Sequence, residues 1–223
     1  MTSALLFPDM AALPGFAFPE PLCEKYRPTR IADFAGLAET KRTLAGFVAN
    51  PRAIGLLFCG PAGTGKTSMA LAVARELHGF IHHVPAGLCT VEKIRELAFS
   101  CHYFPPSGFK RHVIVVDEAD QMSAAAQLAC LSYLDGTSTI PDCVWIFTCN
   151  ATDRLQDRFL SRCRNLAFST HGIQAEATQL MERVWQSETD APAPNMARLI
   201  KESNGNIRAA LSVLDSKLDA LRG

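Results

Sequence analysis

The chain has 223 residues, of which 48% are hydrophobic and 20% charged. This length suits one α/β domain with a small additional domain and excludes two full-sized domains. Lysine and arginine balance aspartate and glutamate at 22 each, so the chain lacks the basic excess usual in nucleic-acid-binding modules, and any contact with nucleic acid must use a local patch.

Residues 1–22 predict an extended, proline-rich N-terminal arm. Prolines 8, 14, 19 and 21 stand among three phenylalanines, and proline both fixes φ and removes a backbone donor. The sequence leaves open whether the arm packs on the body or orders only when a partner binds. No secretory signal is recognisable in it, and no apolar stretch of the chain approaches the ~20 residues that span a membrane. We therefore expect a cytoplasmic protein with no membrane partner.

Residues 23–168 alternate between helical and strand-like segments. Helical periodicity covers residues 38–50. The strand-like apolar runs, separated by helical stretches, lie at residues 56–59, 79–84, 112–116 and 143–148. This alternation predicts an α/β domain with a parallel sheet sandwiched by helices.

Metal-binding patterns are weak in this region. The eight cysteines are scattered and none forms a C-x-x-C pair, which argues against a four-ligand zinc site of the usual spacing. His82 and His83 are not expected to bind one metal ion together, because neighbours in a strand point to opposite faces.

Residues 60–67 read GPAGTGKT and directly follow the first strand-like run. In this pattern the glycines let backbone N–H groups turn around a phosphate chain, the lysine faces the β/γ-phosphates, and the hydroxyl reaches Mg²⁺. The following helix presents its N-terminus to the same anion. A glycine-rich turn without a ligand is the alternative, and the flanking strand and helix argue against it. We expect a nucleoside triphosphate to contact Gly60, Pro61, Ala62, Gly63, Thr64, Gly65, Lys66, Thr67 and Ser68.

Two carboxylates follow the strand-like run at residues 112–116. Asp117 would lie at the carboxyl end of the sheet, beside the phosphate loop, and hold Mg²⁺ together with Thr67. Glu118 is placed to orient and polarise the attacking water. A solvated acidic strand end is the alternative, and the phosphate loop earlier in the chain disfavours it.

Asn150 ends the next strand-like run, where its amide could bond a γ-phosphate or the attacking water, although Asn is also a common turn residue. Arg158, Arg162 and Arg164 follow on a helix and its exit. Arginine can stabilise a transferring phosphoryl group, including from a neighbouring subunit. The residues alone leave this reading open against a solvated basic face.

After Phe168 the pattern becomes helical only. An apolar stripe runs from Ile173 to Trp185, a second helix covers residues 196–202, and a third follows Asn204-Gly205-Asn206. Three short amphipathic helices bury little alone, so residues 169–223 predict a small helical lid domain that docks on the first domain or its ligand.

Together these residues resemble the AAA+ ATPases, specifically the clamp-loader branch, which includes the replication factor C small subunits and the bacterial tau/gamma subunit. The likeness covers about residues 23–215. Besides the phosphate loop, the segments that carry it are Glu24-Lys25-Tyr26-Arg27-Pro28 followed by Asp33-Phe34-Ala35-Gly36, Asp117-Glu118-Ala119-Asp120, Thr148-Cys149-Asn150, Ser161-Arg162-Cys163 and Gly205-Asn206-Ile207-Arg208.

The resemblance implies roles for residues far apart in the chain. Tyr26, Arg27 and Pro28 would line the adenine pocket. Ile207 and Arg208 would belong to the sensor 2 segment, with Arg208 reaching the γ-phosphate from the lid.

It also implies roles toward neighbours. Asn150 would act as sensor 1, Arg162 would complete the active site of the adjacent subunit, and Arg95 is the best candidate for facing DNA. The chain departs from the family pattern at Ala62, which replaces a second proline, and at Ser132, where a basic residue usually couples DNA to the ATP site. It also stops at Gly223, so we expect no helical collar of the kind that holds clamp-loader pentamers.

The resulting hypothesis is an ATP-hydrolysing switch that uses Mg²⁺, assembles with copies of itself or with relatives, and acts on DNA or a DNA-bound protein in replication or repair machinery. Without a collar, assembly would rest on the ATPase interfaces, so an ATP-dependent spiral or filament is an alternative.

A second alternative is a true clamp loader, in which other subunits supply the collar. A nucleotide-binding adaptor without turnover is disfavoured, because such a protein needs neither Glu118 nor Arg162. A metabolic P-loop kinase is disfavoured because the segments Ser161-Arg162-Cys163 and Gly205-Asn206-Ile207-Arg208 have no role there.

Overall fold

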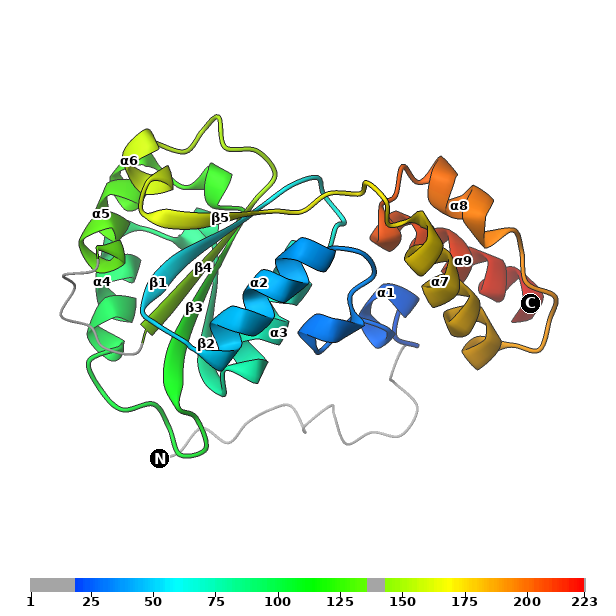
Figure 1. The fold of residues 1–223 in the computed structure, drawn as a ribbon, viewed down its shortest axis with the longest axis horizontal. Helices are drawn as coiled ribbons and strands as arrows, with labels where there is room; N and C mark the ends of the chain where they lie inside the picture. The colour runs from blue at the N-terminus through cyan, green and yellow to red at the C-terminus, as the bar shows by residue number, and fades with distance from the viewer. Residues whose placement is uncertain (1–18, 136–142, 223) are drawn as a thin grey trace, which may run out of the picture.

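The computed structural model describes residues 19–135 and 143–222. Its centre is a parallel sheet of five strands in the order β2-β3-β4-β1-β5 (Figure 1). The strands are β1 (Ile54–Cys59), β2 (Gly79–Pro85), β3 (Arg111–Asp117), β4 (Cys143–Cys149) and β5 (Cys163–Ala167). The predicted parallel α/β sheet is confirmed.

Helices cover both faces of the sheet (Figure 1). The helices of this domain are α2 (Ala38–Ala49), α3 (Lys66–Glu76), α4 (Val91–Ser100), α5 (Ala124–Leu134) and α6 (Asp157–Leu160), with short 3₁₀ turns at Ile31–Asp33, Ala86–Leu88 and Ala119–Gln121. Alternate strand residues feed two separate cores, because successive side chains point to opposite faces. Leu56 and Phe58 pack with α2 and α3, whereas Leu57 packs with α4, α5 and α6.

The fifth strand is the element that the sequence pattern does not reveal. In β5 only Leu166 is buried, and the strand lies at the sheet edge beside β1. An edge strand needs few apolar residues because one side of its backbone and most of its side chains face water. The segment predicted as the exit of a helix is therefore a short strand.

The C-terminal part forms the three predicted helices, α7 (Gln174–Glu188), α8 (Met196–Glu202) and α9 (Ile207–Arg222). They share an apolar core, to which Leu22 of helix α1 (Leu22–Lys25) also belongs. Helix α1 therefore packs on the lid helices, although the α/β domain separates them in sequence. The boundary predicted between residues 22 and 23 falls inside α1 and remains a prediction, and residues 1–18 of the predicted arm lie outside the described residues. In the part of the chain that is described, no helix has the length and apolar character to cross a bilayer.

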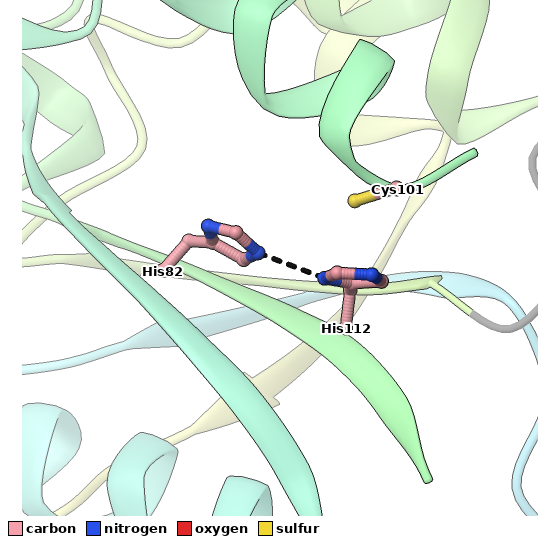
Figure 2. A group of neighbouring side chains, drawn as sticks. All are labelled: His82, Cys101 and His112. Carbon is pink, nitrogen blue, oxygen red and sulfur yellow. Dashed lines mark hydrogen bonds between the residues drawn. The ribbon is translucent and has the colours of Figure 1, made fainter. Parts of the chain in front are cut away.

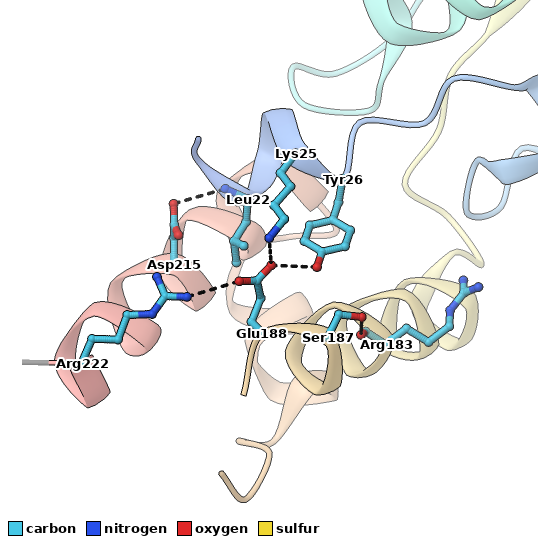
Figure 3. A network of polar contacts seen from close by, with 8 residues as sticks. All are labelled: Leu22, Lys25, Tyr26, Arg183, Ser187, Glu188, Asp215 and Arg222. Atoms are coloured by element: carbon cyan, nitrogen blue, oxygen red, sulfur yellow. Dashed lines mark hydrogen bonds and ion pairs between the residues drawn. The ribbon is translucent and has the colours of Figure 1, made fainter. Parts of the chain in front are cut away.

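A carboxylate at the end of α7 fastens α1 to the lid (Figure 3). Glu188 accepts hydrogen bonds from Lys25 Nζ at 2.6 Å and from Tyr26 Oη at 2.7 Å, and its other oxygen pairs with Arg222 at 3.2 Å. The Glu188 side chain is 7% exposed. The hydrogen bonds from Lys25 and Tyr26 hold the pKa of Glu188 below its ordinary value of 4.5.

We expect Glu188→Gln to lower the free energy of unfolding by about 1 kcal/mol at neutral pH, because a charged acceptor is replaced by a neutral one. A group whose pKa is depressed by folding stabilises the fold above its unfolded pKa, and this contribution disappears as the pH falls through the folded pKa. The difference between wild type and variant should therefore be full at pH 7 and should shrink as the pH falls below 4.5 and through the lowered pKa of Glu188 in the folded protein. Denaturant unfolding at several pH values measures it, with the exposed Glu182→Gln on the same helix as a control that should match wild type throughout.

Candidate nucleotide-binding site

The loop between β1 and α3 has a backbone that only glycine tolerates at several positions. Gly63 and Gly65 have φ of 77° and 85°. A Cβ atom on Gly60 would lie 1.9 Å from the Phe168 carbonyl oxygen, and one on Gly63 would lie 1.9 Å from Asn206 Oδ1 of the lid. The loop is therefore wedged between the sheet and the lid, with the N-terminus of α3 behind it. Because glycines carry no side chains, a phosphate chain could come close to the loop and accept hydrogen bonds from its backbone N–H groups.

Lys66 begins α3 and points back over the loop. Its Nζ donates to the carbonyl oxygens of Gly60 at 2.6 Å and Pro61 at 2.8 Å, and to Asn150 Oδ1 at 3.0 Å. Burial lowers the pKa of Lys66, so a phosphate beside it would favour the charged ammonium. The ends of β1 and β4 thus bring the predicted lysine and asparagine into direct contact.

Asp117 ends β3 at the same edge of the sheet. Its Oδ1 accepts hydrogen bonds from the hydroxyls of Thr67 at 2.8 Å and Thr148 at 2.9 Å. Its Oδ2 lies 2.5 Å from His83 Nε2. The Thr67 hydroxyl and the Asp117 carboxylate are hard oxygen donors that the fold brings together, and this donor set fits Mg²⁺.

Glu118 leaves the strand in a left-handed conformation, with φ 59° and ψ 45°. This conformation is uncommon outside glycine and concentrates at functional sites. Its backbone N–H donates to Thr148 Oγ1 at 3.1 Å, while its side chain is exposed in the cleft. The carboxylate therefore faces the space beside Lys66 rather than the protein interior.

A cleft runs from these strand ends to the lid. Its inner part is lined by Ala62, Gly63, Gly65, Lys66, Thr67, Ser68, Glu118, Thr148, Cys149, Asn150 and Arg208. Its outer part is lined by Cys23, Tyr26, Arg27, Pro28, Phe34, Ala35, Gly63, Thr64, Gly65, Ser68, Leu180, Ile207, Arg208 and Leu211. The two parts share Gly63, Gly65, Ser68 and Arg208. One cleft therefore joins the residues predicted for phosphates with those predicted for adenine.

Five predicted residues line neither part of this cleft. Gly60, Pro61 and Asp117 adjoin it through hydrogen bonds to Lys66 or Thr67, whereas Arg162 and Arg95 lie elsewhere. Arg162 follows α6, and its Nε donates to Asp135 Oδ1 at 2.5 Å while its Nη1 donates to the Arg158 carbonyl oxygen at 3.1 Å. Arg95 is exposed on α4. Neither side chain lines either part of the cleft.

Two residues at or near the cleft escape sequence reasoning. Leu180 of α7 lines the outer part, and His83 contacts Asp117 from the neighbouring strand. For His83, the only sequence signal is the alternation of side chains along a strand, which places His82 and His83 on opposite faces of the sheet. The structure confirms that separation, because His82 instead meets His112.

A model of the ATPase family associated with various cellular activities (AAA) matches residues 56–170, which is more than half of the chain. This region contains the phosphate loop, Asp117, Glu118, Asn150 and Arg162. The family named by the sequence resemblance is confirmed.

Similar proteins come from archaea and eukaryotes. Replication factor C subunit 3 of Blastobotrys adeninivorans is 34% identical over 88% of this chain and 60% of its own length. The replication factor C small subunit of Picrophilus torridus is 32% identical over 86% and 62%, and human replication factor C subunit 4 is 29% identical over 90% and 59%. The chain thus spans about three fifths of the length of these relatives.

Solved structures show the same fold. The RuvB Holliday junction branch migration motor of Thermotoga maritima superposes with a TM-score of 0.69 at 20% identity, over 83% of this chain and 62% of that one. This likeness shows the fold, and the match to the family model over more than half of the chain establishes the family. The chain belongs to the AAA family of ATPases.

Proposed function

We propose that this chain binds and hydrolyses ATP with Mg²⁺, and that it works as a clamp-loader-like switch subunit in DNA replication or repair machinery. One observation carries the proposal. One cleft holds an apolar outer part for a base and an inner part with Lys66 and Glu118 for the phosphates, and Asp117 contacts Thr67 of that inner part.

The outer part would take the adenine. Tyr26 and Pro28 come from the segment after α1, and Ile207 and Leu211 come from α9 of the lid. A base between them would touch both the α/β domain and the lid. Binding of the nucleotide would therefore stabilise the conformation in which the lid lies against the phosphate loop. The population of that conformation would rise when the nucleotide binds.

The inner part would carry the hydrolysis. Lys66 would neutralise the β/γ-phosphates, Glu118 would orient the attacking water, and Asn150 and Arg208 would hydrogen-bond the γ-phosphate. Thr67 and Asp117 would hold the Mg²⁺ ion, which supplies charge neutralisation of the phosphates when bound.

Arg162 would act on a neighbouring subunit. Its side chain is one third exposed and lies outside its own cleft, yet phosphoryl transfer gains from an arginine at the transferring group. A second copy or a relative, placed with its cleft against this surface, would receive it. This arrangement supports a homo- or hetero-oligomer with shared active sites.

DNA is the proposed target because similar proteins are named as replication factor C subunits. Arg95 is exposed on α4 and is the proposed contact with the phosphate backbone. With 22 basic and 22 acidic residues overall, this contact would be a local one that several subunits together reinforce.

The proposal is tested by ATP turnover against protein concentration, with and without primed DNA. We expect the specific activity to rise with protein concentration and to rise again when DNA is added. Absence of turnover under every condition would point instead to a nucleotide-binding adaptor. A specific activity that is constant over concentration would contradict the shared site while leaving the hydrolysis intact.

A further inference from the structure

A second group of metal-ligating side chains lies apart from the nucleotide cleft. His82 of β2, His112 of β3 and Cys101 at the end of α4 have one ligand atom each within 4.8 Å of one another (Figure 2). His112 is the second residue of β3, whereas Asp117 is the last. At about 3.3 Å per strand residue, five residues separate the two places by roughly 16 Å, so the group is distinct from the predicted Mg²⁺ residues.

The hydrogen bonds around His112 show which of its ring nitrogens carries no proton and can therefore bind a metal ion. Nε2 lies 3.0 Å from the Tyr103 carbonyl oxygen, which can only accept a hydrogen bond. Nε2 therefore carries the proton, and the lone pair is on Nδ1, 2.9 Å from His82 Nε2. A ring whose outer N–H donates to a backbone carbonyl is the usual arrangement of a metal-bound histidine.

Cys101 supplies a third ligand atom beside the two imidazoles. Cys101 Sγ lies 3.3 Å from Cys143 Sγ, within hydrogen-bond distance, and binding of a metal ion would itself remove the thiol proton. Cys101 and His112 are buried, whereas His82 is only half-buried. The group is therefore open to solvent on the His82 side.

We propose that His82, Cys101 and His112 form a binding site for Zn²⁺ or a similar soft divalent cation, with solvent as the fourth ligand. Two imidazoles and a thiolate bind Zn²⁺ in preference to Mg²⁺ or Ca²⁺, which favour oxygen ligands. Tetrahedral Zn–N bonds of 2.0–2.1 Å put two nitrogens about 3.3 Å apart. His82 would need to move by only a few tenths of an ångström from its present 2.9 Å contact, and its exposed side permits that.

The ion would fasten the loop between α4 and β3 to the sheet. Cys101 and His112 bracket this loop, and Tyr103 and Phe104 on it are 61% and 100% exposed. Cross-linking both ends of the loop to β2 would restrict its conformations, as any closure of a loop does. The site would therefore be structural, and it would hold an exposed aromatic surface in a fixed position.

The test is titration of the reduced, full-length protein with Co²⁺ in the absence of nucleotide, followed by displacement with Zn²⁺. We expect one equivalent of Co²⁺ to bind with a thiolate charge-transfer band in the near ultraviolet and with visible bands typical of tetrahedral coordination. Zn²⁺ should displace it and raise the melting temperature.

Cys101→Ser should abolish the charge-transfer band, and His82→Gln should weaken Co²⁺ binding by more than the ~10–100-fold that loss of an outer-shell partner costs. His82→Gln is the safer variant for folding because the side chain is half-buried, and circular dichroism confirms the fold of each. His102→Gln, an exposed histidine beside Cys101, should bind as wild type does. Binding that survives Cys101→Ser and His82→Gln, or no binding by wild type, would show that the two imidazoles only share a proton.

Discussion

Glu118→Gln should stop ATP turnover almost completely while leaving ATP binding unchanged. The substitution keeps the size of the side chain but removes the charge that would polarise the attacking water. Loss of such a group typically costs about 10²–10⁴-fold in rate. Because Glu118 is exposed in the cleft and its backbone N–H keeps its bond to Thr148, we expect stability to change by less than about 0.5 kcal/mol. Single-turnover hydrolysis and equilibrium binding of a fluorescent ATP analogue measure the two effects separately.

A matched variant makes this result specific. Asp153 is an exposed carboxylate three residues after Asn150, and it lines neither part of the cleft. Asp153→Asn should therefore turn over ATP at the wild-type rate. If Glu118→Gln kept more than a tenth of wild-type turnover, another group would have to orient the water. If it lost ATP binding as well, the carboxylate would be part of the binding site rather than of the hydrolytic step.

The local part of this site could be predicted from sequence because its residues sit in short, strict patterns. The phosphate loop needs glycines with positive φ at Gly63 and Gly65, and no other residue adopts that backbone cheaply. Asp117 is the last residue of a strand whose interior positions are all buried, so its position at the carboxyl end of the sheet follows from the apolar run. In both cases the physical requirement acts within eight residues or fewer.

Contacts between distant segments could not be predicted in the same way. His112 meets His82 because β2 and β3 pair in the register Phe80 with His112 and His82 with Ile114, and register is a property of two strands together. Likewise, Tyr26 reaches Glu188 across 162 residues, since α1 packs on the lid. The strand β5 was missed for another reason, because only Leu166 among its residues is buried.

Arg162→Ala should reduce turnover by about 10³–10⁵-fold if its guanidinium completes a neighbour's site. Within its own chain the substitution breaks a partly exposed ion pair with Asp135 and a hydrogen bond to the Arg158 carbonyl oxygen, each of which is worth about 1 kcal/mol or less at an exposed site. The fold and ATP binding should therefore persist. Arg164→Ala, an exposed arginine two residues further on β5, should keep wild-type activity.

Mixing two inactive variants then separates a shared site from a self-contained one. Arg162→Ala keeps its own cleft intact, and Glu118→Gln still presents Arg162 to its neighbour. In an equal mixture that exchanges subunits at random, one interface in four joins an intact cleft to an intact arginine, so about a quarter of the wild-type activity should return. A mixture as inactive as its components would mean that Arg162 acts within its own chain. Recovery would place the active site between subunits, and it would make ATP a ligand that each pair of neighbours binds together.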